Sequence, residues 1–362
     1  MFAFATTAAL ICTQAVTGAN SASLDSYPEY NVEHQVVGPI RSLGGTLGGQ
    51  YKAWEQAFKK FHPEARFVDE LVSSESSIGG LYSGAADLGP SGREAQVMDL
   101  LPFVETFGYL PTGIIVASGA WDPGKKGGSA SLAVMVHKDN PLTQLTMKQL
   151  DGVFGSERSG GFEDYVWTPR YGRGPEDNIR TWGQLGLTGE WKDKAIHTYG
   201  YAYTGMRYFF QLKVFHGADK FNPNYQEYVE TESKMVDRTS KEGHRLTIDA
   251  MLADLSKDRF GIAYAPLHYA KQFTNLRPIA LAPSEGAPAI APTKENYQNR
   301  TYPLTRSIYV YLNRPPNHPV APNLREYLRF ILSRQGQQAV IDYGRYLHLP
   351  LAVLREQLKK LE

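Results

Sequence analysis

Apolar side chains recur early in the chain at the spacing of an amphipathic helix. Four aromatic residues lie three and four positions apart, which places them on one helix face. They are Tyr51, Trp54, Phe58 and Phe61. Because a proline cannot continue a helix, we expect this helix to end before Pro63. Apolar runs on either side predict a strand, a glycine loop, the helix and a second strand within residues 36–72.

The same order of strand, turn and helix returns within residues 83–107. We expect a short strand around Ala86–Gly89. The pair Ser91 and Glu94 fits a capping box, with serine as the N-cap and glutamate at the third helical position. Residues 112–118, TGIIVAS, predict another buried strand.

A stretch rich in Gly, Pro and Ser, residues 119–131, indicates a boundary between two parts of the chain. Further elements follow it. We expect a strand, turn and helix in 132–154, a helix and strand in 244–267, mostly loop in 276–305, and a strand and two helices in 306–350. Strands that alternate with helices predict an α/β fold with mixed, largely parallel sheets. With 362 residues, the chain is long enough for two lobes.

Composition excludes several classes of protein. Hydrophobic residues make up 42% and charged residues 21%, which is typical of a soluble globular protein. The net charge of +1 argues against a nucleic-acid partner, whose binding surface needs a basic excess. The single cysteine, Cys12, allows no internal disulfide and no multi-thiolate metal site.

The first residues, 1–23, read as a signal peptide, although no Lys or Arg opens them. Small residues such as Ala19, Ser21 and Ala22 lie near the expected cleavage point. A lipid anchor on Cys12 is the alternative, but Ile11 before it is larger than such sites usually accept. We therefore expect an exported protein, periplasmic or extracellular.

Catalytic signatures are missing from the sequence. It has no H-E-x-x-H, C-x-x-C, G-x-S-x-G or S-x-x-K, and its nine histidines show no metal-ligand spacing. GGTLGGQ is not a P-loop, because no Gly-Lys-Ser/Thr closes it. We expect no enzyme activity, no metal and no cofactor.

What remains is a set of loop-to-helix junctions with small and hydroxyl residues. Each offers unpaired N–H groups at the positive end of a helix dipole, and together they would form an oxyanion cage. The alternative is that each is only a helix cap. The junctions are Gly44–Gly49, Ser73–Ser77, Ser91–Arg93 and Thr204–Gly205.

At this point the chain resembles the phosphate-binding, periplasmic substrate-binding proteins of ABC phosphate importers. The stretches that carry the resemblance are GGTLGGQYKAWEQAFKKFHPEARF, SGAADLGPSGRE, FGYLPTGIIVA, LAVMVHKDNPLTQLTMKQLDGVF, WGQLGLTGEW, FGIAYAPL and YLRFILSRQGQQAVIDYGRYLHLP. The resemblance implies two α/β lobes that close like a hinge over an anion. One lobe would comprise residues 24–120 plus 303–362, and the other 121–302.

The resemblance also implies ligand positions. In the first lobe they are Thr46, the backbone of Leu47, Ser76 or Ser77, Ser91 and Arg93. Gly92 departs from the family, which has an aspartate or a serine there. The aspartate accepts a proton from phosphate and so rejects fully ionised sulfate. Without it, discrimination by protonation state has lost its physical basis.

The second departure lies in YGYAYTGMRYFFQL, residues 199–212. Where the family carries an arginine this chain has Tyr201, and where it carries Ser-Gly-Thr the chain reads Thr204-Gly205-Met206. A tyrosine donates at most one hydrogen bond, whereas an arginine binds an oxyanion with two charge-assisted bonds. Arg207 lies one residue further on and points either toward the ligand or outward as a solvated charge.

Three hypotheses follow. The first is an exported, monomeric binding protein that captures phosphate or a related oxyanion for an ABC permease. The second keeps the fold but gives it an organic or phosphonate-like ligand against a wall of tyrosines at 199, 201 and 203. The third is a receptor or scaffold with no ligand. An extracytoplasmic hydrolase is disfavoured, because no nucleophile and base are arranged together.

Overall fold

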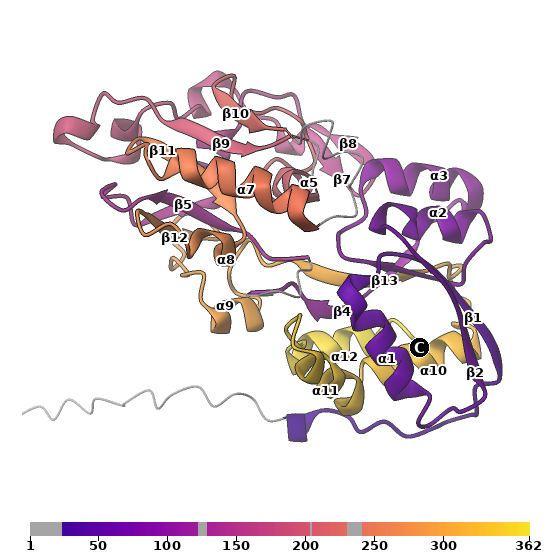
Figure 1. Cartoon of the computed structure of the whole chain (residues 1–362). Helices are drawn as coiled ribbons and strands as arrows, with labels where there is room; N and C mark the ends of the chain where they lie inside the picture. Colours follow the sequence, from indigo (N-terminus) through magenta and orange to yellow (C-terminus); the bar gives the residue numbers. More distant parts are fainter. Residues whose placement is uncertain (1–23, 122–128, 203–204, 230–240) are drawn as a thin grey trace, which may run out of the picture.

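The computed structural model describes residues 24–121, 129–202, 205–229 and 241–362. The predicted signal peptide, residues 1–23, lies outside this range. Within it, the chain forms two α/β lobes, each built around its own mixed sheet (Figure 1). The predicted fold class is therefore confirmed.

The first lobe is built on a five-stranded sheet in the order β2-β1-β3-β13-β4. β1 runs parallel to β2 and β3, whereas β13 is antiparallel to both β3 and β4. The final strand is thus inserted between two early ones. The strands are β1 Gly38–Gly44, β2 Ala65–Leu71, β3 Leu88–Ser91, β4 Thr112–Ser118 and β13 Ser307–Leu312.

Helices cover both faces of this sheet (Figure 1). On one face the predicted aromatic positions of α1 are confirmed, since Tyr51, Trp54 and Phe58 are fully buried. The helix ends at Phe58, so Phe61 packs from the following turn. This face carries α1 Gln50–Phe58, α10 Pro322–Ile331, α11 Arg334–Tyr343 and α12 Leu351–Lys359, and the other carries α2 Ser77–Tyr82 and α3 Val97–Phe107.

The second lobe is built on a six-stranded sheet in the order β10-β9-β11-β5-β12-β6. β9 is parallel to β10 and β11, and β5 is antiparallel to β11 and β12. Its strands are β5 Ala133–His137, β6 Gln144–Thr146, β9 His197–Tyr201, β10 Tyr225–Tyr228, β11 Gly261–Ala265 and β12 Leu276–Ala282. Its helices are α4 Met147–Phe154, α5 Gly205–Val214, α7 Lys241–Leu255, α8 Leu267–Ala270 and α9 Lys294–Gln298.

Residues 276–305 are mostly loop, as predicted, but the prediction missed one strand and one short helix. β12 occupies the first seven residues, because Ile279 and Leu281 are buried against neighbouring strands, and α9 follows. The high content of Pro and Ala hid this strand. Short 3-10 helices fill several connections: Leu24–Ser26, Leu47–Gly49, Ser74–Ser76, Pro169–Tyr171, Pro175–Asp177, Trp182–Leu185 and Gly189–Trp191.

Two crossover segments join the lobes, one after β4 and one before β13. They touch each other where the Gly119 N–H donates to the Arg306 carbonyl at 2.7 Å and the Arg306 N–H donates to Ser131 Oγ at 3.0 Å. A hairpin of β7 Gly161–Glu163 and β8 Val166–Thr168 makes a further contact, since Tyr165 in its turn packs against the cluster under α2 and α3. The crossovers place residues of both lobes beside Arg306.

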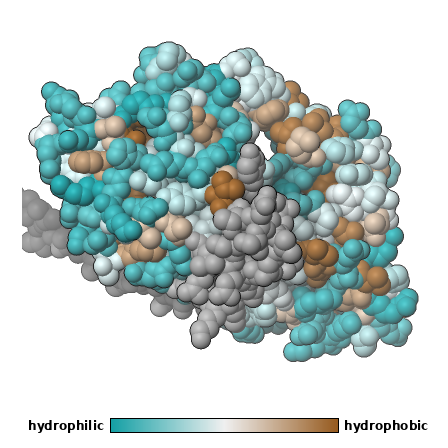
Figure 2. All heavy atoms as spheres, turned by 45° about the horizontal axis from the view of Figure 1, so that its top comes forward, coloured by the Kyte–Doolittle hydropathy of each residue, from teal (hydrophilic) through white to brown (hydrophobic). Residues whose placement is uncertain are grey.

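Hydrophilic side chains cover most of the described surface visible in Figure 2, and apolar residues gather in small separated groups. Among the described residues, no helix combines the length and the apolar character that a bilayer crossing requires.

Candidate functional site

The first junction is a tight turn between β1 and α1. Leu47, Gly48 and Gly49 have φ angles of 47°, 60° and 92°, a left-handed run that favours glycine. Thr46 Oγ1 accepts a hydrogen bond from the Gly48 N–H at 3.1 Å. Within the described part of the chain, the N–H groups of Thr46 and Leu47 have no acceptor. The turn therefore presents free donors at the start of α1.

The second and third junctions meet this turn. The Gly45 N–H and Ser77 Oγ both donate to the Pro90 carbonyl, each at 2.7 Å. The Gly92 N–H donates to Ser74 Oγ at 3.0 Å. Three separate segments therefore lie in contact, and we refer to Gly44–Gly49, Ser73–Ser77 and Ser91–Arg93 together as the junction cluster.

Ser91 does not cap a helix as predicted. Its hydroxyl donates to the Arg93 carbonyl at 2.9 Å and accepts from the Arg93 N–H at 3.3 Å. The helix α3 begins six residues after Ser91, where the Asp99 carboxylate accepts from the Gln96 N–H at 2.8 Å. The predicted Ser91–Glu94 capping box is wrong, because Asp99 both caps the later start and binds Arg93.

Arg93 is fully engaged by lobe 1. Its guanidinium donates to both carboxylate oxygens of Asp99, at 2.6 and 3.0 Å, and to Glu75 at 3.2 Å. Burial opposes the charge, but these two carboxylates together raise the pKa of Arg93 above its ordinary value. The side chain is buried and holds the second and third junctions together.

Gly92 stands beside a hydroxyl from the crossover. A Cβ added to Gly92 would lie 2.0 Å from Ser129 Oγ, so any side chain there would displace Ser129. The Ser129 N–H donates to the Tyr346 hydroxyl at 3.3 Å, which fixes the segment. Ser129 therefore occupies the space of the side chain that Gly92 lacks.

Lobe 2 presents the first turn of α5 to this region. The Gly205 carbonyl accepts from Arg306 Nη2 at 2.9 Å, so the start of the helix touches the crossover. Thr204 lies outside the described residues, as does Tyr203. The lobe 2 contribution that the structure describes is thus Gly205.

Tyr201 lies in the core of lobe 2. Its ring is fully buried, and burial raises the pKa of its hydroxyl, which has no partner among the described residues. The neighbouring Tyr199 is also buried and donates to Asp258 at 2.8 Å. These two rings do not form the open aromatic wall that an organic ligand would need.

Arg207 also turns into lobe 2. It donates to Asp219 at 2.8 Å, pairs with Glu227, and lies 4.3 Å from the centre of the Phe221 ring. Burial opposes the charge, but the two carboxylates raise the pKa of Arg207. Another of its bonds, to the Tyr201 carbonyl at 3.2 Å, ties α5 to β9.

Sequence reasoning missed two buried arginines. Arg306 is 5% exposed, and its Nε lies 4.0 Å from Glu94 Oε2 without a hydrogen bond. Arg345, also 5% exposed, lies directly over Gly48, where an added Cβ would meet its Nη1 at 0.7 Å. Its Nε has no partner among the described residues. For Arg306 the available signal was its place directly before the buried strand β13, whereas Arg345 lies in the turn after α11, where the sequence carried no such signal.

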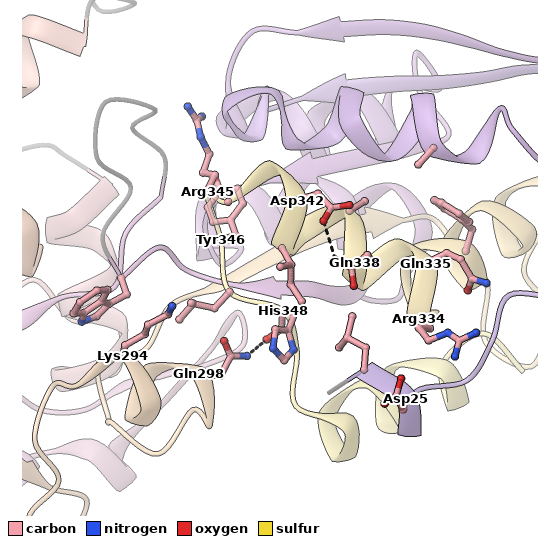
Figure 3. Close-up of a pocket in the computed structure, with 18 of the residues that line it drawn as sticks. Asp25, Lys294, Gln298, Arg334, Gln335, Gln338, Asp342, Arg345, Tyr346 and His348 are labelled. Atoms are coloured by element: carbon pink, nitrogen blue, oxygen red, sulfur yellow. Dashed lines mark hydrogen bonds between the residues drawn. The ribbon is translucent and has the colours of Figure 1, made fainter. Parts of the chain in front are cut away.

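A groove of about 1450 Å³ runs beside Arg345 and Tyr346, between α9 and α11 (Figure 3). Its labelled side chains carry both signs of charge, and several bind one another. Gln298 donates to the His348 carbonyl and Gln338 donates to Asp342 at 2.8 Å. Its mixed charges single out no ligand. Across the described residues, no cluster of acidic residues, histidine and cysteine could hold a metal ion.

Comparison with known proteins gives concordant matches. Residues 128–335 match the model of a PBP superfamily domain. The chain is 32% identical over 359 residues to "Phosphate-binding protein PstS" of Pseudomonas aeruginosa, covering 98% of this chain and 97% of that protein. A Staphylococcus aureus protein of the same name is 26% identical over 117 residues, or 32% of this chain and 34% of its own.

Two solved structures share the fold. An ABC-type phosphate transport receptor from Vibrio cholerae matches with a TM-score of 0.52 and 18% identity, over 86% of this chain and 100% of its own. PstS from Borrelia burgdorferi matches with a TM-score of 0.53 and 16% identity, over 86% and 99%. At these identities the likeness shows the two-lobe fold alone.

Proposed function

The chain belongs to the PstS family of phosphate-binding proteins, and on that premise we propose that it binds inorganic phosphate between its lobes and delivers it to an ABC permease. The junction cluster is the observation that carries the proposal. Three segments with small residues and hydroxyl groups meet at the end of β1, in the turn that leads into α1. Backbone N–H groups at a helix start are the donors that a phosphate oxygen accepts from.

Within the junction cluster, we propose that Thr46 and the Leu47 N–H bind one face of the phosphate. Ser76, Ser77 and Ser91 lie on the adjoining segments, and the hydroxyls that point inward would contribute further bonds. In the structure each of these hydroxyls donates to a carbonyl of lobe 1, Ser76 to Ser73, Ser77 to Pro90 and Ser91 to Arg93, so a hydroxyl that binds the anion would turn its hydrogen toward it. Neutral donors suit an anion that must be released again to a permease.

From lobe 2, we propose that Thr204 and Gly205 at the start of α5 complete the site. Arg93, Tyr201 and Arg207 then have structural roles, because their polar groups bind neighbouring residues or lie in the core. Binding proceeds without covalent chemistry. The two lobes, residues 24–120 plus 303–362 and residues 121–302, move as units in a monomer.

Export completes the proposed function. A receptor that serves a permease works outside the cytoplasmic membrane, and residues 1–23 supply the predicted signal peptide. The alternative of an organic ligand loses support, because Tyr199 and Tyr201 are buried within lobe 2.

Calorimetric titration of the purified protein with phosphate tests the proposal. We expect saturable heat with phosphate. Thr46→Val should weaken phosphate binding by about tenfold, the value of one good hydrogen bond, and Thr46→Ser should restore it. Absence of heat with millimolar phosphate would rule the function out.

A further inference from the structure

Arg345 is a buried cation that no described residue neutralises. Its side chain comes from the turn after α11 and is 5% exposed. Within the described ranges its guanidinium forms no hydrogen bond and no ion pair, and its Nε atom is sealed from solvent. The other buried arginines of those ranges each donate to at least one oxygen of the protein: Arg93, Arg158, Arg207 and Arg306. A buried charge without a partner is costly, so this position favours a bound anion.

The guanidinium lies against the turn that opens α1. It covers Gly48, where an added Cβ would lie 0.7 Å from its Nη1. The Tyr343 hydroxyl donates to the Gly48 carbonyl at 2.8 Å, which fixes the end of α11 on the same turn. The N–H groups of Thr46 and Leu47, the two residues before Gly48, have no acceptor in the described part of the chain. A positive side chain and two free donors therefore lie together at the positive end of the α1 dipole.

Arg345 also borders open space. It lines the groove of about 1450 Å³ that runs between α9 and α11. In Figure 3 its side chain extends from the turn away from the other labelled side chains of the groove. The carboxylate closest to it in sequence, Asp342, accepts instead from Gln338 at 2.8 Å. A small anion can therefore approach the guanidinium without displacing a carboxylate of the protein.

We propose that Arg345 supplies the positive charge of the phosphate site. One phosphate oxygen accepts from the free N–H groups of Thr46 and Leu47, and another accepts from the Arg345 guanidinium. The arginine expected in lobe 2 is replaced by Tyr201, whose ring lies in the core of that lobe. The cation of this chain thus comes from lobe 1, from a turn that no motif assigned to the site. This inference rests on the proposed function, because it assumes that the anion binds beside the α1 turn.

An Arg345→Gln variant tests the charge with two measurements. Because the guanidinium has no protein partner, the thermal unfolding midpoint without phosphate should stay the same or rise. Phosphate affinity, measured by calorimetry, should fall by about tenfold or more, since charge-assisted hydrogen bonds are lost. Arg345→Lys should bind with intermediate affinity, because it keeps the charge but loses the planar donors. Arg355→Gln, an exposed change on α12 of the same lobe, is the control and should alter neither quantity.

Gly48→Ala tests the same contact from the other side. Its methyl group would displace the guanidinium, so phosphate affinity should fall by a factor close to that of Arg345→Gln. In the Arg345→Gln background, Gly48→Ala should cost little further affinity, because the contact is already gone. Gly84→Ala is the matched control. Gly84 has a φ of 74° beside the 60° of Gly48, so both variants carry the left-handed strain, but nothing surrounds the added Cβ of Gly84.

The outcomes separate the inference from the proposed function. If the wild type binds phosphate and folded Arg345→Gln binds it equally well, the inference fails alone. A lower unfolding midpoint with unchanged affinity would assign Arg345 a structural role and overturn the inference in the same way. If Arg345→Gln does not fold, the affinities of Arg345→Lys and Gly48→Ala decide. If the wild type does not bind phosphate, the proposed function fails and the inference fails with it.

Discussion

The two lobes differ in how their polar groups are used where they face each other. On lobe 1 the first turn leaves the N–H groups of Thr46 and Leu47 open, and small residues bring three segments together. On lobe 2 the tyrosine that replaces the expected arginine is buried, and Arg207 is bound by Asp219 and Glu227. Among the described residues, the open backbone donors of the proposed site therefore lie in lobe 1.

From this difference we propose that an arginine near the site need not bind the ligand. Arg93 and Arg207 were the expected sources of positive charge, yet each is held by two carboxylates of its own lobe. Such pairs fix loops and helices, and their charge is already balanced. Arg306 differs because its nearest carboxylate lies 4.0 Å away without a hydrogen bond.

The strongest test of the comparison restores an arginine at position 201. Because Tyr201 is fully buried, Tyr201→Arg would place an unpaired charge in the core of lobe 2. We expect a loss of about 3–5 kcal/mol in the free energy of unfolding and no gain in phosphate affinity. Chemical denaturation measures the free energy of unfolding, and calorimetry measures the phosphate affinity. Tyr201→Phe is the control and should be close to neutral, since the hydroxyl has no partner. Tighter phosphate binding by Tyr201→Arg would show that lobe 2 is open after all.

The next test replaces Arg93, whose guanidinium binds carboxylates within lobe 1. Arg93→Gln breaks the bonds to Asp99 and Glu75, and we expect a loss of about 2–3 kcal/mol at neutral pH. Phosphate affinity should change by less than about threefold. A larger loss of binding in a folded variant would place Arg93 among the ligand groups.

The stability difference between wild type and Arg93→Gln should also depend on pH. Partial burial acts to raise the pKa of Glu75, but Ser73 and Arg93 together hold it below its ordinary 4.5. A lowered folded pKa means that this stabilisation is complete above 4.5 and is lost as the pH falls through the folded value. Thermal unfolding from pH 7 to pH 3 should therefore show the difference narrowing. A constant difference would mean that Glu75 contributes nothing to it.

The smallest effect is expected at Arg207. Its partners Asp219 and Glu227 are 67% and 39% exposed, so solvent weakens both ion pairs. Arg207→Gln should cost about 1–2 kcal/mol of stability, mostly through the packing on Phe221 and the bond to the Tyr201 carbonyl. Phosphate affinity, measured by calorimetry, should stay within about twofold of the wild-type value. Lys213→Gln, a change on the same helix, is the control. A clear loss of affinity at unchanged stability would contradict the assignment.

Local patterns predicted the elements best where the pattern was strong. The α1 aromatics Tyr51, Trp54 and Phe58 are buried as their spacing required, and β4 covers the predicted residues 112–118. The apolar pattern was weak in residues 276–305, where the high content of Pro and Ala made β12 look like loop. It was ambiguous before α3, because two capping patterns lie close together. The helix follows the later pattern, because the Asp99 carboxylate caps that start and also binds Arg93.

The candidate site was predictable only in part. Glycine and hydroxyl residues before helices pointed to Gly44–Gly49, Ser73–Ser77 and Ser91–Arg93, and these segments do meet. Arg345 gave no local signal, because it lies in the turn after α11, far in sequence from the Gly48 that it covers. Whether Arg207 points inward or outward depends on Asp219 and Glu227, which no spacing rule connects to it.

The position of β13 has a consequence for the order in which the chain folds. This strand lies between β3 and β4 and is antiparallel to both, so the lobe 1 sheet stays in two pieces until residues 307–312 arrive. All strands of the lobe 2 sheet lie between β4 and β13 and meet earlier along the chain. Contacts between distant segments form slowly because a long loop must close first. A chain that is synthesised from its N-terminus would therefore complete lobe 2 before lobe 1. Until β13 arrives, β3 and β4 would each expose an unpaired strand edge.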